Sequence, residues 1–122
     1  MIKTSTLRAG KCRNLEQALS DLQITEYLQA VDGWKPEGGA IVRTFQFLDY
    51  YRALAFVNAM AWMVHAQDHH PEITLTYNRC VVRFNTHSVN GGKGGISEND
   101  FICAAQTDAL YEQAPGMPGA LA

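Results

Sequence analysis

The sequence has few cysteines and no excess of charge of either sign. Its three cysteines, Cys12, Cys80 and Cys103, are an odd number without the paired spacing of a zinc site, which argues against a disulfide framework and favours a reducing compartment. The formal net charge is −2 and the ten basic residues are scattered, so no surface for nucleic acid or anionic lipid is expected. A cytoplasmic location is the expectation.

Long apolar runs are also missing. The N-terminus, Met1 to Thr4, lacks the hydrophobic segment of a secretion signal. The longest apolar stretch, from Leu54 to Val64, is interrupted by Asn58 and is too short to cross a bilayer. The sequence therefore predicts no membrane role.

The length and composition suit one domain. The chain has 122 residues, 47% of them hydrophobic, and contains no internal repeat. The two ends are expected to be dispensable for the fold. Residues 1–12 are a short segment of mixed composition, and the Pro-Gly pairs near the C-terminus cannot continue a helix or strand. We predict one domain over residues 13–113 with flexible tails at 1–12 and 114–122.

The hydrophobic periodicity predicts the order helix, two strands, helix, two strands, helix. A first helix is expected from a cap at Asn14 to about Asp32, and a short strand and turn over 33–39 then lead into a strand over 40–48. Asp49 is expected to cap a second helix that runs to about Gln67, and a Ser-x-x-Asp pattern at Ser97–Asp100 predicts the start of the last.

The second predicted helix is apolar on nearly all sides between Ala53 and Val64. A helix of this kind is covered on more than one side. We expect one side to face the sheet and another to meet a second subunit.

The second pair of strands alternates apolar and polar residues over 73–77 and 80–84. A two-residue turn at Asn78-Arg79 would place Ile73 opposite Phe84 and, extended, His70 opposite His87. A shift of two residues would still leave these histidines neighbours.

Three of the four histidines flank this hairpin, in Asp68-His69-His70-Pro71-Glu72 and Thr86-His87-Ser88. Imidazole gives and takes protons near neutral pH, so the cluster favours acid–base chemistry on a bound ligand. A helix end, where cationic histidine complements the helix dipole, is the simpler interpretation of His69 and His70. A zinc site using His65 and His69 is disfavoured, because no cysteine or well-placed carboxylate ligand accompanies them.

Three other features have two interpretations each. The loop Gly91–Gly95 resembles a phosphate loop, but Lys93 is followed by glycine, so a flexible rim or plain loop is favoured. Trp34 is either a half-buried strand aromatic or a stacking wall for a ligand. Asp100 is either a helix cap or a ligand-facing carboxylate.

The ordered set His65, His69-His70-Pro71, Tyr77, His87 and Asp100 resembles the pterin-4a-carbinolamine dehydratase family, also called 4a-hydroxytetrahydrobiopterin dehydratases. The resemblance runs from Gly33-Trp34 to Asp108-Ala109-Leu110. It implies an α+β fold, a two-layer α/β sandwich with a four-stranded antiparallel sheet and helices on one face, assembled as a homodimer or homotetramer. The loop from Ser88 to Asn99 departs from the animal members by its greater length.

The resemblance also implies a reaction, the loss of water from 4a-hydroxytetrahydrobiopterin to give quinonoid dihydrobiopterin, without a metal or redox cofactor. It assigns His69 and His87 to proton transfer and His70 to holding the pterin. Further positions border the family's pterin pocket: Asp68, Pro71, Asn85, Thr86 and Ser88. A role in molybdopterin metabolism and a non-catalytic dimerisation module are the alternative functions.

Overall fold

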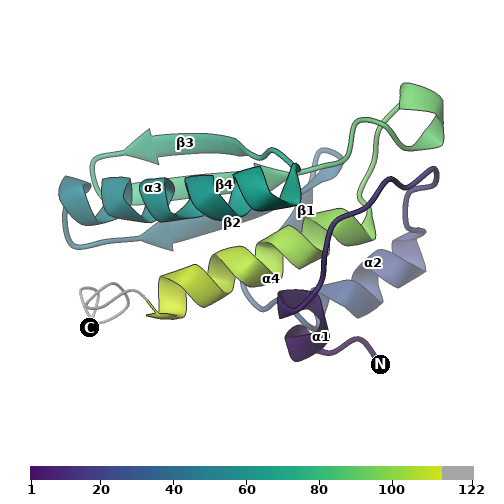
Figure 1. The fold of residues 1–122 in the computed structure, drawn as a ribbon, viewed down its shortest axis with the longest axis horizontal. Helices are drawn as coiled ribbons and strands as arrows, with labels where there is room; N and C mark the ends of the chain where they lie inside the picture. Colours follow the sequence, from purple (N-terminus) through teal and green to yellow (C-terminus); the bar gives the residue numbers. More distant parts are fainter. Residues whose placement is uncertain (114–122) are drawn as a thin grey trace.

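The computed structural model describes residues 1–113, so the predicted tail at 114–122 lies outside the described residues (Figure 1). The sheet has the strand order β1-β2-β4-β3, with every neighbouring pair antiparallel. In chain order the elements are α1 (Thr4–Arg8), α2 (Asp21–Leu28), β1 (Lys35–Glu37), β2 (Ala40–Gln46), α3 (Tyr50–Gln67), β3 (Glu72–Thr76), β4 (Arg79–Phe84), the 3₁₀ helix η1 (Asn90–Gly92) and α4 (Glu98–Gln113).

Helices α3 and α4 pack against the sheet, as Figure 1 shows. Alternate strand residues face them and are buried, among them Phe45 of β2 and Val82 of β4, while Thr44 and Thr74 on the opposite face are exposed. The predicted α+β fold, a four-stranded antiparallel sheet with helices packed on it, is confirmed. No helix within residues 1–113 combines the length and apolar character that a membrane crossing needs.

Local sequence signals set the ends of the two long helices. The Asp49 carboxylate accepts a hydrogen bond from the Arg52 backbone N–H at 2.9 Å, which confirms the predicted cap of α3. At the start of α4, the Ser97 backbone N–H donates to Asp100 Oδ2 at 2.8 Å, as the Ser-x-x-Asp pattern predicts.

The predicted start of the first long helix at Asn14 is wrong. Helix α2 begins only at Asp21, where Ser20 and Gln23 form a reciprocal capping box. The preceding residues are not helical because their backbone groups bond to distant loops: the Leu19 N–H donates to the Ile96 carbonyl at 2.8 Å, and the Glu16 carbonyl accepts from the Asn90 N–H. Tertiary partners thus outweigh the local helical pattern.

A short helix that the sequence did not predict lies before the predicted domain boundary. Helix α1 packs beside α4 (Figure 1), and its Leu7 is only 3% exposed. The Thr4 hydroxyl donates to the Ala30 carbonyl at 2.7 Å. The boundary at residue 13 stays a prediction, but a packed element precedes it.

The predicted register of the second hairpin is wrong by two residues. Ile73 pairs with Val82 rather than Phe84, and the turn is at Tyr77-Asn78. The central strand β4 pairs with β2 as well, and the Asn78 carbonyl accepts from the Phe47 N–H at 2.8 Å, so the first hairpin fixes where β4 begins. Continued beyond the paired residues, this register sets His69 opposite Thr86, and it sets Asp68, not His70, opposite His87.

A buried polar cluster joins α4 to the sheet. The Asp108 carboxylate accepts hydrogen bonds from Trp34 Nε1 at 2.9 Å and from Arg43 Nη1 at 2.7 Å. The Arg43 guanidinium also lies 4.4 Å from the ring centre of Phe45. Burial raises the pKa of Asp108 to about 6, although the bonds from Trp34 and the charge of Arg43 oppose this shift.

Replacing Asp108 with alanine should lower the free energy of unfolding by about 3 kcal/mol, because the buried Trp34 N–H and the Arg43 charge lose their partner. Urea denaturation measures the loss. Glu112→Ala is the matched control, since this carboxylate on the same helix pairs with Arg8 at the surface and should cost less than about 1 kcal/mol. Equal losses in the two variants would contradict the account.

Candidate active site

The end of α3 positions His69. Asp68 adopts a left-handed conformation, with φ 52°, which ends the helix, and the chain then runs without helix into β3. Successive side chains in an extended chain point to opposite sides. Accordingly His69 lines one cavity, of about 280 Å³, whereas His70 lines another hollow, of about 320 Å³, beside α3.

The cavity that contains His69 lies where four separate segments meet. They are the N-terminal segment, the end of α3, the segment after β4 and the start of α4. Its volume suits a small ring system rather than a polymer. The lining residues are Cys12, Arg13, Asn14, Gln67, Asp68, His69, Thr86, Ser88 and Asn99.

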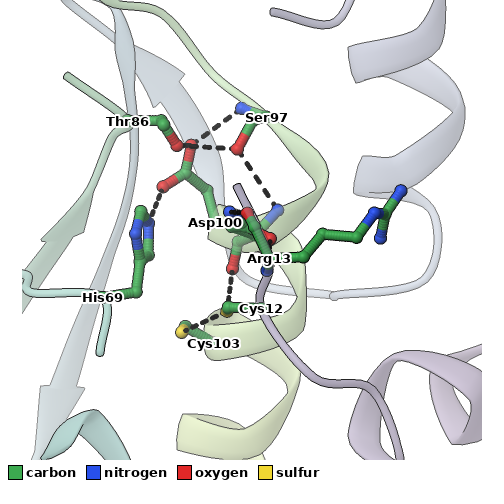
Figure 2. A network of polar contacts seen from close by, with 8 residues as sticks. Cys12, Arg13, His69, Thr86, Ser97, Asp100 and Cys103 are labelled. Atoms are coloured by element: carbon green, nitrogen blue, oxygen red, sulfur yellow. Dashed lines mark hydrogen bonds and ion pairs between the residues drawn. The ribbon is translucent and has the colours of Figure 1, made fainter. Parts of the chain in front are cut away.

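A buried carboxylate holds the His69 ring (Figure 2). His69 Nε2 lies 2.6 Å from Asp100 Oδ1, and Asp100 has no exposed surface. The other oxygen, Oδ2, accepts hydrogen bonds from the Ser97 N–H at 2.8 Å and the Thr86 hydroxyl at 3.0 Å. Asp100 therefore caps α4 and fixes His69 with the same carboxylate, while contact with a ligand stays a prediction.

The surroundings of His69 favour its cationic form. Burial opposes the charge, but the hydrogen bond and the negative charge of Asp100 outweigh it, so the pKa of His69 is raised above its ordinary value. The ring also stacks on Phe84, with centroids 6.1 Å apart and an interplanar angle of 8°. With Nε2 engaged, Nδ1 is the ring nitrogen left for proton exchange.

The other two predicted catalytic histidines are on the surface of the single chain. His70 has a side chain that is 72% exposed and lies 3.9 Å from Asp68. His87 is exposed, between Thr86 and Ser88, which both line the cavity. One chain therefore places only His69 in this cavity.

Three further predicted binding residues lie away from the cavity lining. Pro71 lines the hollow that contains His70 and His65. Asn85 is half-buried just after β4. Trp34 is 4% exposed and packs against Phe84, the ring on which His69 stacks. Trp34 therefore supports this stack from the core and has no free face for a ligand.

Sequence reasoning missed the wall that the N-terminal segment forms. The Asn99 side chain binds both backbone groups of Arg13, accepting from its N–H at 3.1 Å and donating to its carbonyl at 2.6 Å. Gln67 accepts from the Cys12 N–H at 2.7 Å and donates to the Gly10 carbonyl. No local pattern in residues 10–14 indicates these contacts. The hint that the sequence offers is the side-chain amide of Gln67, which directly precedes Asp68-His69.

Metal ligation finds no support in the arrangement of side chains. No group of three or more histidine, cysteine, aspartate or glutamate side chains in residues 1–113 is placed to hold an ion. His65 and His69, the pair considered from the sequence, line different hollows.

A two-layer α+β fold in which a buried carboxylate holds an imidazole beside a small cavity defines a class of protein, one suited to acid–base chemistry on a small ligand. Comparison with known sequences specifies the family. The sequence profile described as "Pterin 4 alpha carbinolamine dehydratase" matches residues 17–110. The chain belongs to this family, which confirms the resemblance noted in the sequence.

Two individual relatives and one crystal structure support the same family. A Bdellovibrio bacteriovorus protein named "Putative pterin-4-alpha-carbinolamine dehydratase" is 56% identical over 110 residues, 90% of this chain and 92% of the relative. A protein of the same name from Stenotrophomonas maltophilia is 48% identical over 117 residues, 94% of this chain and 97% of the relative. The crystal structure titled transcriptional coactivator/pterin dehydratase from Brucella melitensis matches with a TM-score of 0.71 and 34% identity, over 77% of this chain and 98% of that chain.

Replacing Asp100 with asparagine should destabilise the protein, and more strongly at low pH. A raised pKa means that protonated His69 stabilises the fold, so its contribution is complete below the unfolded pKa of about 6.5 and is lost as the pH rises through the folded value. The difference in unfolding free energy between wild type and Asp100→Asn should be largest below about pH 6.5 and should shrink as the pH rises through the folded pKa of His69. Urea denaturation at a series of pH values measures this difference.

The exposed Asp21 at the first turn of α2 offers the control, since Asp21→Asn changes the charge by the same amount away from any histidine partner. The change in unfolding free energy that Asp21→Asn causes should not vary with pH as His69 titrates. A difference for Asp100→Asn that stays constant with pH would argue against the ion pair.

Proposed function

We propose that this protein is a 4a-hydroxytetrahydrobiopterin dehydratase that removes water from the 4a-hydroxy compound to give quinonoid dihydrobiopterin, and thereby supports pterin recycling for aromatic amino acid hydroxylation. The observation that carries the proposal is the pair formed by half-buried His69 and fully buried Asp100 beside a small cavity in a chain of this family. The chemistry needs an acid for the departing C4a hydroxyl and a base for the N5 proton.

His69 is the proposed acid. Its raised pKa keeps a proton available near neutral pH, and Asp100 holds the ring so that Nδ1 is free to donate. When the proton leaves, the neutral ring keeps its Nε2–H bond to Asp100, so the ring need not turn between steps. General acid catalysis of this kind contributes a factor of about 10²–10⁴ in rate.

His87 is the proposed base. Its neighbours Thr86 and Ser88 line the cavity, and the segment is fixed because Thr86 pairs with Gly95 through the backbone and with Ser97 through its hydroxyl, at 2.7 Å. His70 is proposed to hold the pterin, with Asp68, Pro71, Asn85, Thr86 and Ser88 at the border. Buried Trp34 is not carried into this site.

The test is the decay of freshly generated 4a-hydroxytetrahydrobiopterin, followed by ultraviolet absorbance with and without protein. His69→Ala and His87→Ala should each lower kcat by about 10²-fold or more while the fold is retained by circular dichroism. Asp21→Asn is the control and should keep its activity, because Asp21 is exposed on α2 and lines neither the cavity that contains His69 nor the hollow that contains His70. Full activity in His87→Ala would refute the assignment of the base, and no acceleration by folded wild type would refute the dehydratase.

The protein is further proposed to act as a homodimer or homotetramer assembled through α3. Tyr51 and Trp62, eleven residues or about three turns apart on this helix, are each 80% exposed. The adjacent β3 is an edge strand whose Ile73 and Leu75 are only half-buried. A second copy on this surface would cover the hollow that contains His70 and bring that histidine into an enclosed site.

Trp62→Glu should shift the mass measured by light scattering toward that of the monomer, because a carboxylate cannot be buried there without a partner. Leu22→Glu is the matched control, since Leu22 is 70% exposed on α2, away from this surface. An unchanged mass in Trp62→Glu, or the same shift in both variants, would contradict assembly through α3.

A further inference from the structure

Two thiols far apart in the sequence meet beside the cavity. Cys12 Sγ and Cys103 Sγ are 3.5 Å apart, and the structure holds both residues as free cysteines (Figure 2). Cys12 is half-buried and lines the cavity, whereas Cys103 on α4 has no exposed surface. Nothing in the proposed dehydration uses either sulfur atom.

We propose that Cys12 and Cys103 form an oxidisable pair, in which a hydroperoxide that reaches the cavity converts the two thiols into a disulfide fastening the N-terminal segment to α4. A disulfide bond is about 2.05 Å long, so the two sulfur atoms need to approach by about 1.5 Å. The third cysteine, Cys80, lies buried in β4 and has no thiol partner among the described contacts, so it should stay reduced.

The positions of the two sulfurs assign their roles. Cys12 is the one that a small oxidant can reach, and the hydrogen bond with the Cys103 thiol lowers the pKa of Cys12. The positive charges of His69 and Lys11 also lower this pKa, whereas burial and the negative charge of Asp100 oppose the shift. The hydrogen bond to Cys12 and burial raise the pKa of Cys103. Cys12 is therefore the attacking thiolate and Cys103 the resolving thiol.

The reaction proceeds in two steps. The Cys12 thiolate attacks one peroxide oxygen, the O–O bond breaks, and the products are a sulfenic acid on Cys12 and the alkoxide or hydroxide of the peroxide. Cys103 then attacks the Cys12 sulfur, the S–S bond forms and the S–O bond breaks, and the leaving hydroxide takes the Cys103 proton to become water. Together the two thiols lose two electrons, and one peroxide molecule gains them.

The disulfide would act on the wall of the cavity. The wall is now held by the hydrogen bonds of Gln67 and Asn99 to the backbone of residues 12 and 13. A covalent link between residues 12 and 103 closes a long loop and restricts the unfolded chain. The oxidised protein should therefore unfold at a higher temperature than the reduced protein, and a thiol reductant should reverse the shift.

The experiment treats the purified full chain with a small excess of hydrogen peroxide, then titrates thiols in denaturant and measures the intact mass. Wild type should fall from three titratable thiols to one and lose about 2 Da, and peptide mapping should join the fragments that contain Cys12 and Cys103. Dithiothreitol should restore three thiols. Cys80→Ser should still lose two thiols, which controls for the third cysteine.

The single replacements separate the two steps. Cys103→Ser should stop at the sulfenic acid, trapped as a dimedone adduct on Cys12, and Cys12→Ser should form neither adduct nor disulfide. Three thiols remaining in treated wild type, a bond between two chains, or oxidation of Cys12 to the sulfinic acid without a disulfide would each overturn the proposal. These readouts do not use dehydratase activity, so their failure is distinguishable from failure of the proposed function.

Discussion

The structure of the site depends on one carboxylate. Asp100 is completely buried, yet each of its oxygens has a hydrogen-bond partner: Oδ1 faces His69 Nε2, and Oδ2 accepts from the Ser97 N–H and the Thr86 hydroxyl. A buried carboxylate without these partners would cost several kcal/mol, roughly the stability margin that many small domains have. The fold therefore tolerates Asp100 only when the start of α4, the end of β4 and the α3–β3 junction are assembled together.

This constraint also explains how a small protein prepares a histidine for proton transfer. The same contacts that stabilise the helix start hold the His69 ring against Phe84 and raise its pKa, so structure and proposed chemistry share one set of hydrogen bonds. Within one chain, the part of the proposed site that His70 and His87 form is not enclosed. His70 and His87 remain exposed, which fits a protein whose exposed apolar helix face is proposed to meet another copy.

Features that local chemistry determines were predictable from the sequence. Asp49 and the Ser97–Asp100 pattern cap helices through contacts within four residues, and both helix starts were predicted correctly. The start of α2 was not predicted correctly, because the backbone groups of residues 16 and 19 form hydrogen bonds with distant loops. The Ser20–Gln23 capping box, which marks the true start, was overlooked. The hairpin register failed for a related reason, since β2 fixes β4, and the wall built by Arg13 and Asn99 has no local pattern.

The measurement that tests the central claim most directly is nitrogen-15 NMR of the histidine rings, titrated with pH in wild type and in Asp100→Asn. Imidazole nitrogens that carry a proton and those that do not resonate at distinct frequencies, so the spectrum reports the tautomer and the pKa of His69 together. The account predicts a proton on Nε2 throughout and a raised pKa that falls when Asp100 loses its charge. A neutral ring protonated on Nδ1, or a pKa that Asp100→Asn leaves unchanged, would contradict it.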